Sequence, residues 1–347
     1  MATKLAVLGA TGYGGVELVR LLENHPAVEL AYLSSESYAG QRMCQVYPHL
    51  KGVDMPLRAL DAAEVTRECE FALLSLPAGK SMEIVPRLLE AGLRVVDISP
   101  DFRLREAAAY RQWYKVDHTC AELLAEAVSG IPEWYRDDIA TANLVAAPGC
   151  YSTAAVLALA PLLAEKLIAP EDIIVDGKSG VSGGGRTALS LPFHYPEANE
   201  DIAAYAVGGH RHLPEMIQGL AELAECEASI TFTPHLAPMT RGILLTIYAT
   251  PAPGVEAPAL REALLRYYAE ERFVEVMPAG QWPHTKWTAG TNLCFLSAAT
   301  DRQSGRAIIL AALDNLGKGM AGQMLQCLNL MVGVDEATCL AASAAYP

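Results

Sequence analysis

The sequence has few positive charges for its length, with 26 lysines and arginines against 40 aspartates and glutamates. The resulting formal net charge of −14 repels nucleic acid and anionic lipid, so we expect neither as a partner. An anionic small-molecule substrate would instead need a local group of basic residues within this acidic chain.

Closely spaced cysteine pairs are also missing. The eight cysteines are scattered along the chain, and no C-x-x-C pair occurs. This spacing excludes a zinc knuckle and a small disulfide scaffold, and we expect no bound metal. Free thiols in a chain of this size indicate a reducing compartment.

Long apolar runs are absent as well. The run from Ala154 to Ala164 is shorter than the roughly 20 residues that span a bilayer. The apolar residues 5–8 are soon interrupted by glycines, Glu17 and Arg20, which is not the pattern of a signal peptide. We therefore expect a cytoplasmic protein that does not enter a membrane.

The first half of the chain alternates short apolar runs with amphipathic segments. Its 347 residues, 52% of them hydrophobic, suffice for about two globular domains. Buried strands are expected at 4–8, 29–33, 71–76, 94–98 and 144–147, with helices at 15–23 and 81–91. This alternation predicts an α/β fold with a Rossmann-like, doubly wound parallel sheet.

The second half has longer strands and a different order of elements. Strands are expected at 173–176, 230–233, 242–250, 292–299 and 307–313, and helices at 151–166, 213–224 and 256–272. This indicates an α+β domain with a mixed or antiparallel sheet. Because the last amphipathic segment has room to fold back, we predict one domain of 1–148 with 315–347, and another of 149–314.

A glycine-rich turn separates the first strand from the first helix. Small residues at this place let backbone N–H groups approach a pyrophosphate at a helix N-terminus. The spacing is G-x-x-G-x-x-G, which is weak by itself, and an ordinary glycine-rich turn is the alternative; the position after a strand favours dinucleotide binding. The candidate residues are Gly9, Thr11, Gly12, Tyr13, Gly14 and Gly15.

The end of the second strand bears on the choice of cofactor. NAD enzymes usually place a carboxylate here for the ribose 2′-hydroxyl. Ser34 and Ser35, with Arg42 further on, would instead tolerate a 2′-phosphate, although Glu36 could fill the acidic role. We therefore favour NADP(H).

Cys150 is the candidate nucleophile. It follows Pro148-Gly149 after a strand and opens the predicted helix. The positive end of a helix dipole stabilises a thiolate and lowers the pKa of a cysteine from its free value of about 8.5. A non-reactive core cysteine is the ordinary alternative, and it is the reading we give Cys294 and Cys327.

Two histidines are candidates for the acid and base. His210 and His212 precede a predicted helix, and a nucleophilic cysteine usually works with an imidazole. The sequence does not decide between them, and we favour His210. His25, His49 and His118 are interpreted as solvated surface residues.

Two segments suit an anion. The loop from Ser179 to Arg186 is dense in glycine backbone donors and ends on an arginine. Arg103 follows a strand of the parallel sheet, on the edge where ligands bind, and Arg241 is a second candidate. A flexible loop and surface ion pairs are the alternatives.

The sequence resembles the N-acetyl-gamma-glutamyl-phosphate reductases. The motifs that carry this resemblance run in the family's order over the whole chain: GATGYGGVELVRLL at 9–22, SLPAG at 75–79, DFR at 101–103, PGCYST at 148–153, SGVSGGGR at 179–186, HRHLPE at 210–215, PHLAPMTRGI at 234–243 and DNLGKGMAGQMLQCLNLM at 314–331. Cys327 stands where the family often has a polar residue, which affects nothing catalytic.

The resemblance implies an NADP-binding domain completed by the C-terminal helix, and a catalytic domain of the semialdehyde dehydrogenase type that forms a homotetramer or homodimer. It implies that Cys150 attacks an acyl phosphate, that a hydride reduces the thioester, and that His210 or His212 supplies a proton as the hemithioacetal collapses. Further cofactor contacts would come from Leu76, Pro77, Ser182, Gly183 and Asn315, and substrate contacts from Arg103, Ser179, Arg186 and Arg241.

Two alternatives remain from the sequence. One is a related reductase of aspartyl phosphate or of a carrier-linked aminoadipyl phosphate, because specificity depends on pocket shape. The other is a regulator that binds NADP without catalysis, which the combination of Cys150, the histidine pair and two anion loops disfavours.

Overall fold

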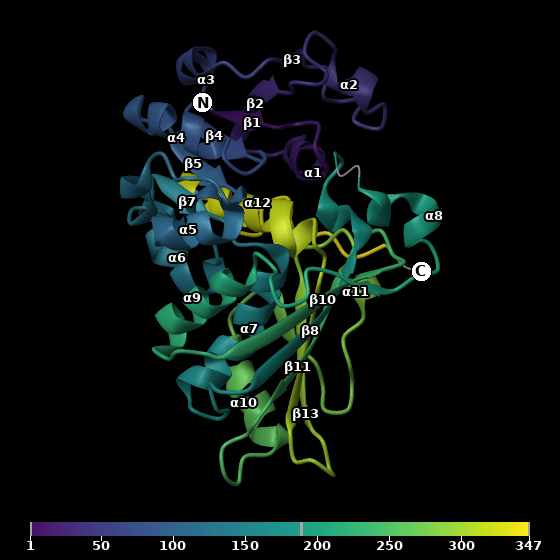
Figure 1. The fold of residues 1–347 in the computed structure, drawn as a ribbon. Coiled ribbons are helices and arrows are strands. Elements are labelled where there is room, and N and C mark those ends of the chain that lie inside the picture. The colour runs from purple at the N-terminus through teal and green to yellow at the C-terminus, as the bar shows by residue number, and fades with distance from the viewer. Residues whose placement is uncertain (1, 188–189, 346–347) are drawn as a thin grey trace. The chain divides into compact units, whose positions relative to one another are not determined.

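The computed structural model describes residues 2–187 and 190–345 and divides into two compact units (Figure 1). Unit 1 comprises Met1–Pro148 and Met320–Ala341, and unit 2 comprises Gly149–Gly319 and the residues from Ala342 onward. We predicted from sequence that the chain returns to the first domain after residue 314. It returns after Gly319 instead, so Asn315 belongs to unit 2. In the described ranges, no helix has the length and apolarity needed to cross a bilayer.

Unit 1 contains a seven-stranded sheet in the order β3-β2-β1-β4-β5-β7-β6, with all neighbouring strands parallel. Its strands are β1 Thr3–Leu8, β2 Val28–Ser34, β3 Leu57–Arg58, β4 Phe71–Leu74, β5 Arg94–Asp97, β6 Val128–Ser129 and β7 Leu144–Ala146. The strand order reverses beside β1, which confirms the predicted doubly wound sheet.

The helices of unit 1 bury their apolar stripes against this sheet. They are α1 Tyr13–Leu22, α2 Met43–Val46, α3 Ala62–Glu68, α4 Ser81–Glu90, α5 Ala107–Tyr114, α6 Pro132–Thr141 and α12 Gly322–Val332. The C-terminal helix α12 packs against α1, α6 and β5, so the end of the chain completes the unit. Strands β1, β4 and β5 form the core between the helices, because nearly every side chain in them is buried.

His25 anchors α12, contrary to our interpretation of it as a surface residue. It is buried, its Nε2 lies 2.8 Å from Oδ1 of Asn329, and its Nδ1 accepts hydrogen bonds from the backbone N–H groups of Ala27 and Val28. Burial lowers the pKa of His25, opposed by the Asn329 contact. The neutral ring therefore joins the α1–β2 turn to the C-terminal helix.

Unit 2 contains a mixed seven-stranded sheet in the order β12-β13-β14-β11-β8-β10-β9. The strands are β8 Ile173–Gly180, β9 Ala203–Ala204, β10 Ile230–Ala237, β11 Ile243–Ala249, β12 Val274–Val276, β13 Cys294–Thr300 and β14 Ala307–Leu313. β8 pairs with β10 in parallel and with β11 in antiparallel register, which confirms a mixed sheet.

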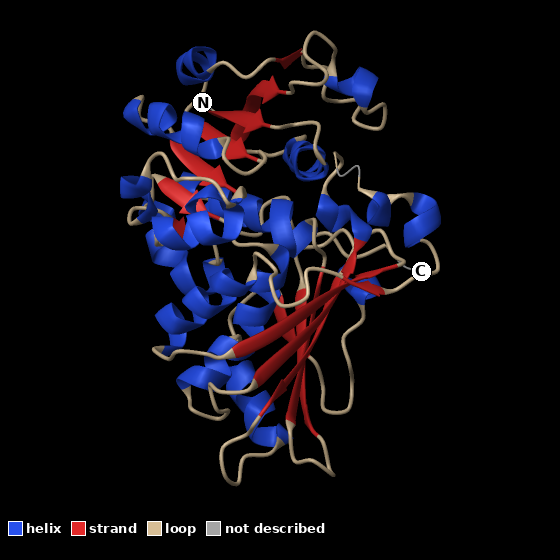
Figure 2. Ribbon diagram, viewed as in Figure 1, coloured by secondary structure: helices blue, strands red, loops and turns tan. Residues whose placement is uncertain are grey.

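Three long helices lie on one side of this sheet, as Figure 2 shows: α7 Cys150–Ala164, α9 Leu213–Ala224 and α10 Ala257–Tyr267. Short helices α8 Tyr195–Ala198 and α11 Thr285–Thr288 lie in connecting segments. Every residue of α7 from Tyr151 to Leu163 is buried, so the helix is apolar all round, as a central helix must be. The other side of the sheet carries half-exposed side chains such as Tyr248 and Leu310.

A buried carboxylate ties β5 to α4 in unit 1. Asp97 is fully buried, and it accepts hydrogen bonds from the hydroxyls of Ser81 and Ser99 at 3.0 and 2.5 Å and from the Ser99 N–H at 2.9 Å. Burial raises the pKa of Asp97 to about 6, against the lowering effect of the serine hydrogen bonds. The native protein therefore holds this proton more tightly than the unfolded chain does.

We predict that Asp97 gives the free energy of unfolding a distinct pH dependence. As the pH rises from about 4 to about 6, the unfolded chain releases this proton first, so unfolding becomes easier by about 2–3 kcal/mol. Asp97→Asn should remove that decline in urea unfolding measured at pH 4 to 7. Asp138→Asn, at an exposed position, is the control and should keep it. An unchanged slope in Asp97→Asn would contradict the prediction.

Candidate functional site

Two positions in the glycine-rich turn of unit 1, Gly9 and Gly15, have no room for a side chain. Gly9 has a φ of +85°, and a Cβ at this position would lie 2.3 Å from the carbonyl oxygen of Ser75. A Cβ on Gly15 would lie 2.1 Å from the carbonyl oxygen of Gly9. The turn is therefore closed on itself and on the end of β4, and it places Gly12 at the N-cap of α1.

Two serine hydroxyls brace this turn. Ser34 Oγ accepts a hydrogen bond from the Gly9 N–H at 2.9 Å, and Ser35 Oγ lies 2.7 Å from Thr11 Oγ1. Both serines are buried. Their hydroxyls therefore hold the loop in shape. That Ser34 and Ser35 also accommodate a ribose 2′-phosphate stays a prediction.

The N-terminus of α1 fits a dinucleotide diphosphate. It has no capping side chain and no acidic residue in its first turn, so an anion meets the positive end of the helix without a competing carboxylate. Leu76 and Pro77 follow β4, the neighbour of β1, at the carboxyl edge of the sheet, where cofactors bind in such folds.

The exposed Arg42 is paired with Asp54, and Glu36 accepts a hydrogen bond from the Leu60 N–H at 3.0 Å.

Arg103 lies at the same edge, just after β5. Its guanidinium donates through Nη2 to the backbone carbonyl of Ile98, which holds the guanidinium close to the strand end. His118, read from sequence as a solvated residue, lies 2.7 Å through Nε2 from the Asp101 carbonyl oxygen and so helps to hold this segment.

In unit 2, Cys150 is the first residue of α7. Gly149 occupies the N-cap and provides no capping side chain, so the sulfur lies at the positive end of a 15-residue helix. The other cysteines are in less reactive surroundings. Burial raises the pKa of Cys69 to about 12 and that of Cys120 to about 11, and Cys294 and Cys327 are completely buried.

His212 packs directly on Gly149. A Cβ at Gly149 would lie 2.3 Å from Nε2 of His212, so the imidazole occupies the space that any larger residue would fill. The Ser152 hydroxyl donates to the His212 carbonyl at 3.3 Å. The start of α9 is thereby fixed to the first turn of α7, and the imidazole lies beside the residue that precedes the nucleophile.

His210 is in an aromatic environment. Its ring contacts those of Tyr151, Tyr205 and Phe232, with centroids 5.2–5.6 Å apart. Burial lowers the pKa of His210 to about 3, assisted by the neighbouring His212. A histidine in these surroundings is neutral near pH 7 and is therefore a weak proton donor.

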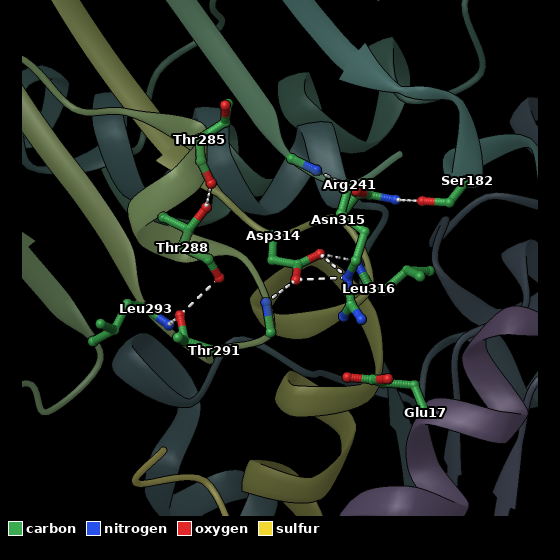
Figure 3. Close-up of polar contacts among 12 residues, drawn as sticks. Glu17, Ser182, Arg241, Thr285, Thr288, Thr291, Leu293, Asp314, Asn315 and Leu316 are labelled. Carbon is green, nitrogen blue, oxygen red and sulfur yellow. Dashed lines mark hydrogen bonds and ion pairs between the residues drawn. The ribbon is translucent and has the colours of Figure 1, made fainter. Parts of the chain in front are cut away.

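Asn315 fastens the glycine-rich loop of unit 2. Its Nδ2 donates to Ser182 Oγ at 2.8 Å and its Oδ1 accepts from the Gly242 N–H at 2.7 Å (Figure 3). Gly183 is exposed beside Ser182. Ser179 is buried in β8 and donates to its neighbour's carbonyl, and Arg186 is half-buried at the far end of the loop.

Asp314 holds Arg241 in the same network. Its fully buried carboxylate lies 2.9 Å from Nε of Arg241 and accepts from the N–H groups of Gly290 at 2.6 Å and Leu316 at 2.9 Å (Figure 3). A buried carboxylate with this many donors has a fixed position. Arg241 is therefore a positioned cation.

A π-helix at Gly317–Ala321 approaches the nucleophile. A Cβ on Gly319 would lie 2.6 Å from Cβ of Cys150, so only glycine fits against the cysteine. Such π-helical turns are rare and often occur at functional sites. Gly319, Asp314 and Glu215 were missed in the sequence, although each lies in or beside a motif quoted there.

Comparison with known families places these features in context. Residues 4–142 match the semialdehyde dehydrogenase NAD binding domain, and residues 150–315 match the semialdehyde dehydrogenase dimerisation domain. N-acetyl-gamma-glutamyl-phosphate reductase of Desulforudis audaxviator is 49% identical over 345 residues, covering 99% of both chains, and that of Pelotomaculum thermopropionicum is 47% identical over 348 residues and the whole of both chains.

The chain belongs to the N-acetyl-gamma-glutamyl-phosphate reductase family. This confirms the resemblance, and with it an oxidoreductase of the semialdehyde dehydrogenase type. Aspartate semialdehyde dehydrogenase II of Vibrio cholerae is similar in fold, with a TM-score of 0.75 at 18% identity over 96% of this chain and 99% of that one. The Candida albicans enzyme with NADP has a TM-score of 0.68 at 15% identity, over 95% and 100% of the two chains.

We predict that adding a methyl group at residue 149 moves the His212 imidazole away from the cysteine. Gly149→Ala should lower kcat about 100-fold, because the His212 ring must move by about an ångström or more. The loss of stability should be about 2–3 kcal/mol, because the cost of displacing the packed ring adds to that of alanine at an N-cap. Steady-state kinetics and thermal unfolding measure the two effects.

Gly209→Ala is the matched control. It lies in the same loop as His210, and a Cβ there meets nothing within 4 Å. Wild-type kcat in Gly149→Ala would show that the position of His212 has no importance for the reaction.

Proposed function

We propose that the protein reduces N-acetyl-gamma-glutamyl phosphate to N-acetylglutamate 5-semialdehyde and phosphate with NADPH, as a step in arginine biosynthesis. Full-length similarity to reductases of that name supports this substrate. The observation that carries the chemistry is the contact of His212 with Gly149, the residue that precedes a cysteine at a helix N-terminus. Cysteine–imidazole pairs of this kind form acyl-enzyme intermediates.

The first half of the reaction forms a thioester. The Cys150 thiolate attacks the acyl carbon, a C–S bond forms, and the bond between the carbon and the phosphate oxygen breaks. The positive end of α7 stabilises the thiolate before the attack and the oxyanion during it.

His212, rather than His210, is the proton donor in this proposal. The departing phosphate needs a proton to leave as hydrogen phosphate, and an imidazolium against Gly149 can give it. His210 is unsuited, because burial keeps its pKa near 3. The proton balance thus assigns the histidine's proton to the departing phosphate. The family resemblance had led us to expect that this proton goes to the collapsing hemithioacetal.

The second half releases the aldehyde. When bound, NADPH supplies the hydride that reduces the thioester carbon. The resulting oxyanion then expels the sulfur, which restores the Cys150 thiolate without a further net proton. His212 regains its proton from solvent before the next turnover.

The fixed cations and loops are proposed to bind the substrate. Arg241, held by Asp314, and Arg103 suit the carboxylate or phosphate of an acyl phosphate, and Ser179 and Arg186 remain further candidates. Asn315 is proposed to act on the cofactor indirectly. Because both ends of its amide are bonded to protein groups, it positions Ser182 and Gly183 for the nicotinamide.

The test follows the reaction by absorbance at about 340 nm, the nicotinamide band. We expect phosphate-dependent reduction of NADP⁺ by N-acetylglutamate semialdehyde, and less turnover with aspartate semialdehyde or with NAD⁺. Cys150→Ser should lower kcat by at least about 1,000-fold, since a serine alkoxide is inaccessible near neutral pH. Cys226→Ser is a control at a thiol whose pKa is raised by burial. Near-normal turnover by Cys150→Ser would exclude the thioester route.

We also propose that the half-exposed face of the unit 2 sheet is where two copies of the chain meet. Cross-strand pairs place Ile174 opposite Tyr248 and Thr246 opposite Leu310, so these side chains share one face. The match of residues 150–315 to a dimerisation domain supports this interface. The face combines apolar side chains with the ion-paired Asp176, Lys178 and His235, and homodimer interfaces bury apolar residues together with polar ones.

A charge in this face should dissociate the dimer. Leu310→Asp puts two carboxylates into the proposed interface, and sedimentation velocity at micromolar protein should then give a monomer. Val116→Glu, an exposed apolar position in unit 1, is the control and should leave the oligomer intact. An unchanged sedimentation coefficient for a folded Leu310→Asp would refute this interface.

A further inference from the structure

Glu215 is a buried carboxylate that the reaction described above does not use. It lies in the first turn of α9, three residues after His212, and is 5% exposed. Its Oε2 accepts a hydrogen bond of 2.9 Å from the N–H of Gly149. A buried carboxylate is costly unless it is bonded, so this contact holds both partners in place.

The contact joins the acid to the two reactive residues. Gly149 immediately precedes Cys150, and the His212 ring packs against the Cα of the same glycine. One residue thus receives the carboxylate on its nitrogen and the imidazole on its other side. Moving Glu215 would shift the start of α7 relative to the histidine, because no side chain caps this helix.

The charge of Glu215 acts on His210, two residues before His212. Burial lowers the pKa of His210 to about 3, and Glu215 opposes that lowering across the loop. His210, Arg211 and Cys150 are the other titratable or charged groups around this point, together with Tyr151 and Tyr205, whose pKa values are raised by burial. A negative charge here stabilises a nearby imidazolium and disfavours a lone thiolate.

We propose that Glu215 is the positioning residue of the Cys150–His212 pair: it fixes Gly149 through the hydrogen bond and keeps His212 in its imidazolium form. This rests on the proposed function, in which the imidazolium delivers a proton to the departing phosphate. With the acid in place, thiolate and imidazolium coexist at working pH as a pair without net charge, and Glu215 supplies the charge that favours the imidazolium.

Glu215→Gln separates charge from shape, because the amide oxygen can still accept from Gly149. We expect the alkaline limb of the kcat profile in the reductive direction to move about one unit toward lower pH, as His212 loses its proton earlier. KM should change little, since Glu215 lies behind the glycine. Glu222→Gln, at an exposed position of the same helix, should leave the profile unchanged.

A second measurement covers the case in which Glu215→Gln does not fold. The ring of His212 in the wild-type enzyme is titrated by NMR, with its signal assigned by its loss in His212→Gln. The proposal requires a midpoint above the ordinary histidine value of about 6.5. A lower midpoint, or an alkaline limb that stays in place in folded Glu215→Gln, overturns it. Both results are independent of Cys150→Ser, so failure of the thioester route is recognised separately.

Discussion

The arrangement of the reactive residues depends on one close contact, the imidazole of His212 against the bare Cα of Gly149. Three elements meet at this glycine: the start of α7, the residues before α9, and through Cys150 the glycine of the π-helix. Each of these close approaches is possible because glycine has no side chain. The nucleophile is therefore positioned by backbone packing, which is more rigid than packing by long side chains.

Polar groups inside the protein hold this backbone in place. Asp314, Asn315 and Glu215 are all buried, and their hydrogen bonds go mainly to backbone N–H groups of loops. Loops have few apolar contacts of their own, so a buried carboxylate or amide that accepts hydrogen bonds from several donors is an effective way to fix them. The same logic applies in unit 1, where Ser34 and Ser35 fix the glycine-rich turn.

Much of the fold could be predicted from sequence, because continuous apolar runs and helical spacing are local signals. The strand at 307–313 and the helix at 213–224 were located to the residue. β8 and β10 extend four residues beyond the prediction, since Lys178 and His235 are polar residues on the half-exposed side of the sheet. Helices α5 and α6 were missed because their hydrophobic patterns are weak.

The site was predictable only in part. Cys150 could be assigned to a helix start from Pro148-Gly149, which is local information. The preference between His210 and His212 could not be settled, because it depends on burial by Tyr151 and Phe232, which come from other segments. The same holds for His25, whose partner Asn329 is 304 residues away. Long-range partners of polar residues leave no periodic trace in one sequence.

The π-helix before α12 sets the length of the chain at this point to the residue. One fewer residue between 317 and 321 would restore ordinary helical winding and rotate all of α12 by about 100°. Asn329 would then turn away from His25, and the side chains of this almost wholly buried helix would no longer meet their present neighbours. The length of this segment is therefore constrained by the packing of α12, whereas the length of a surface loop is not.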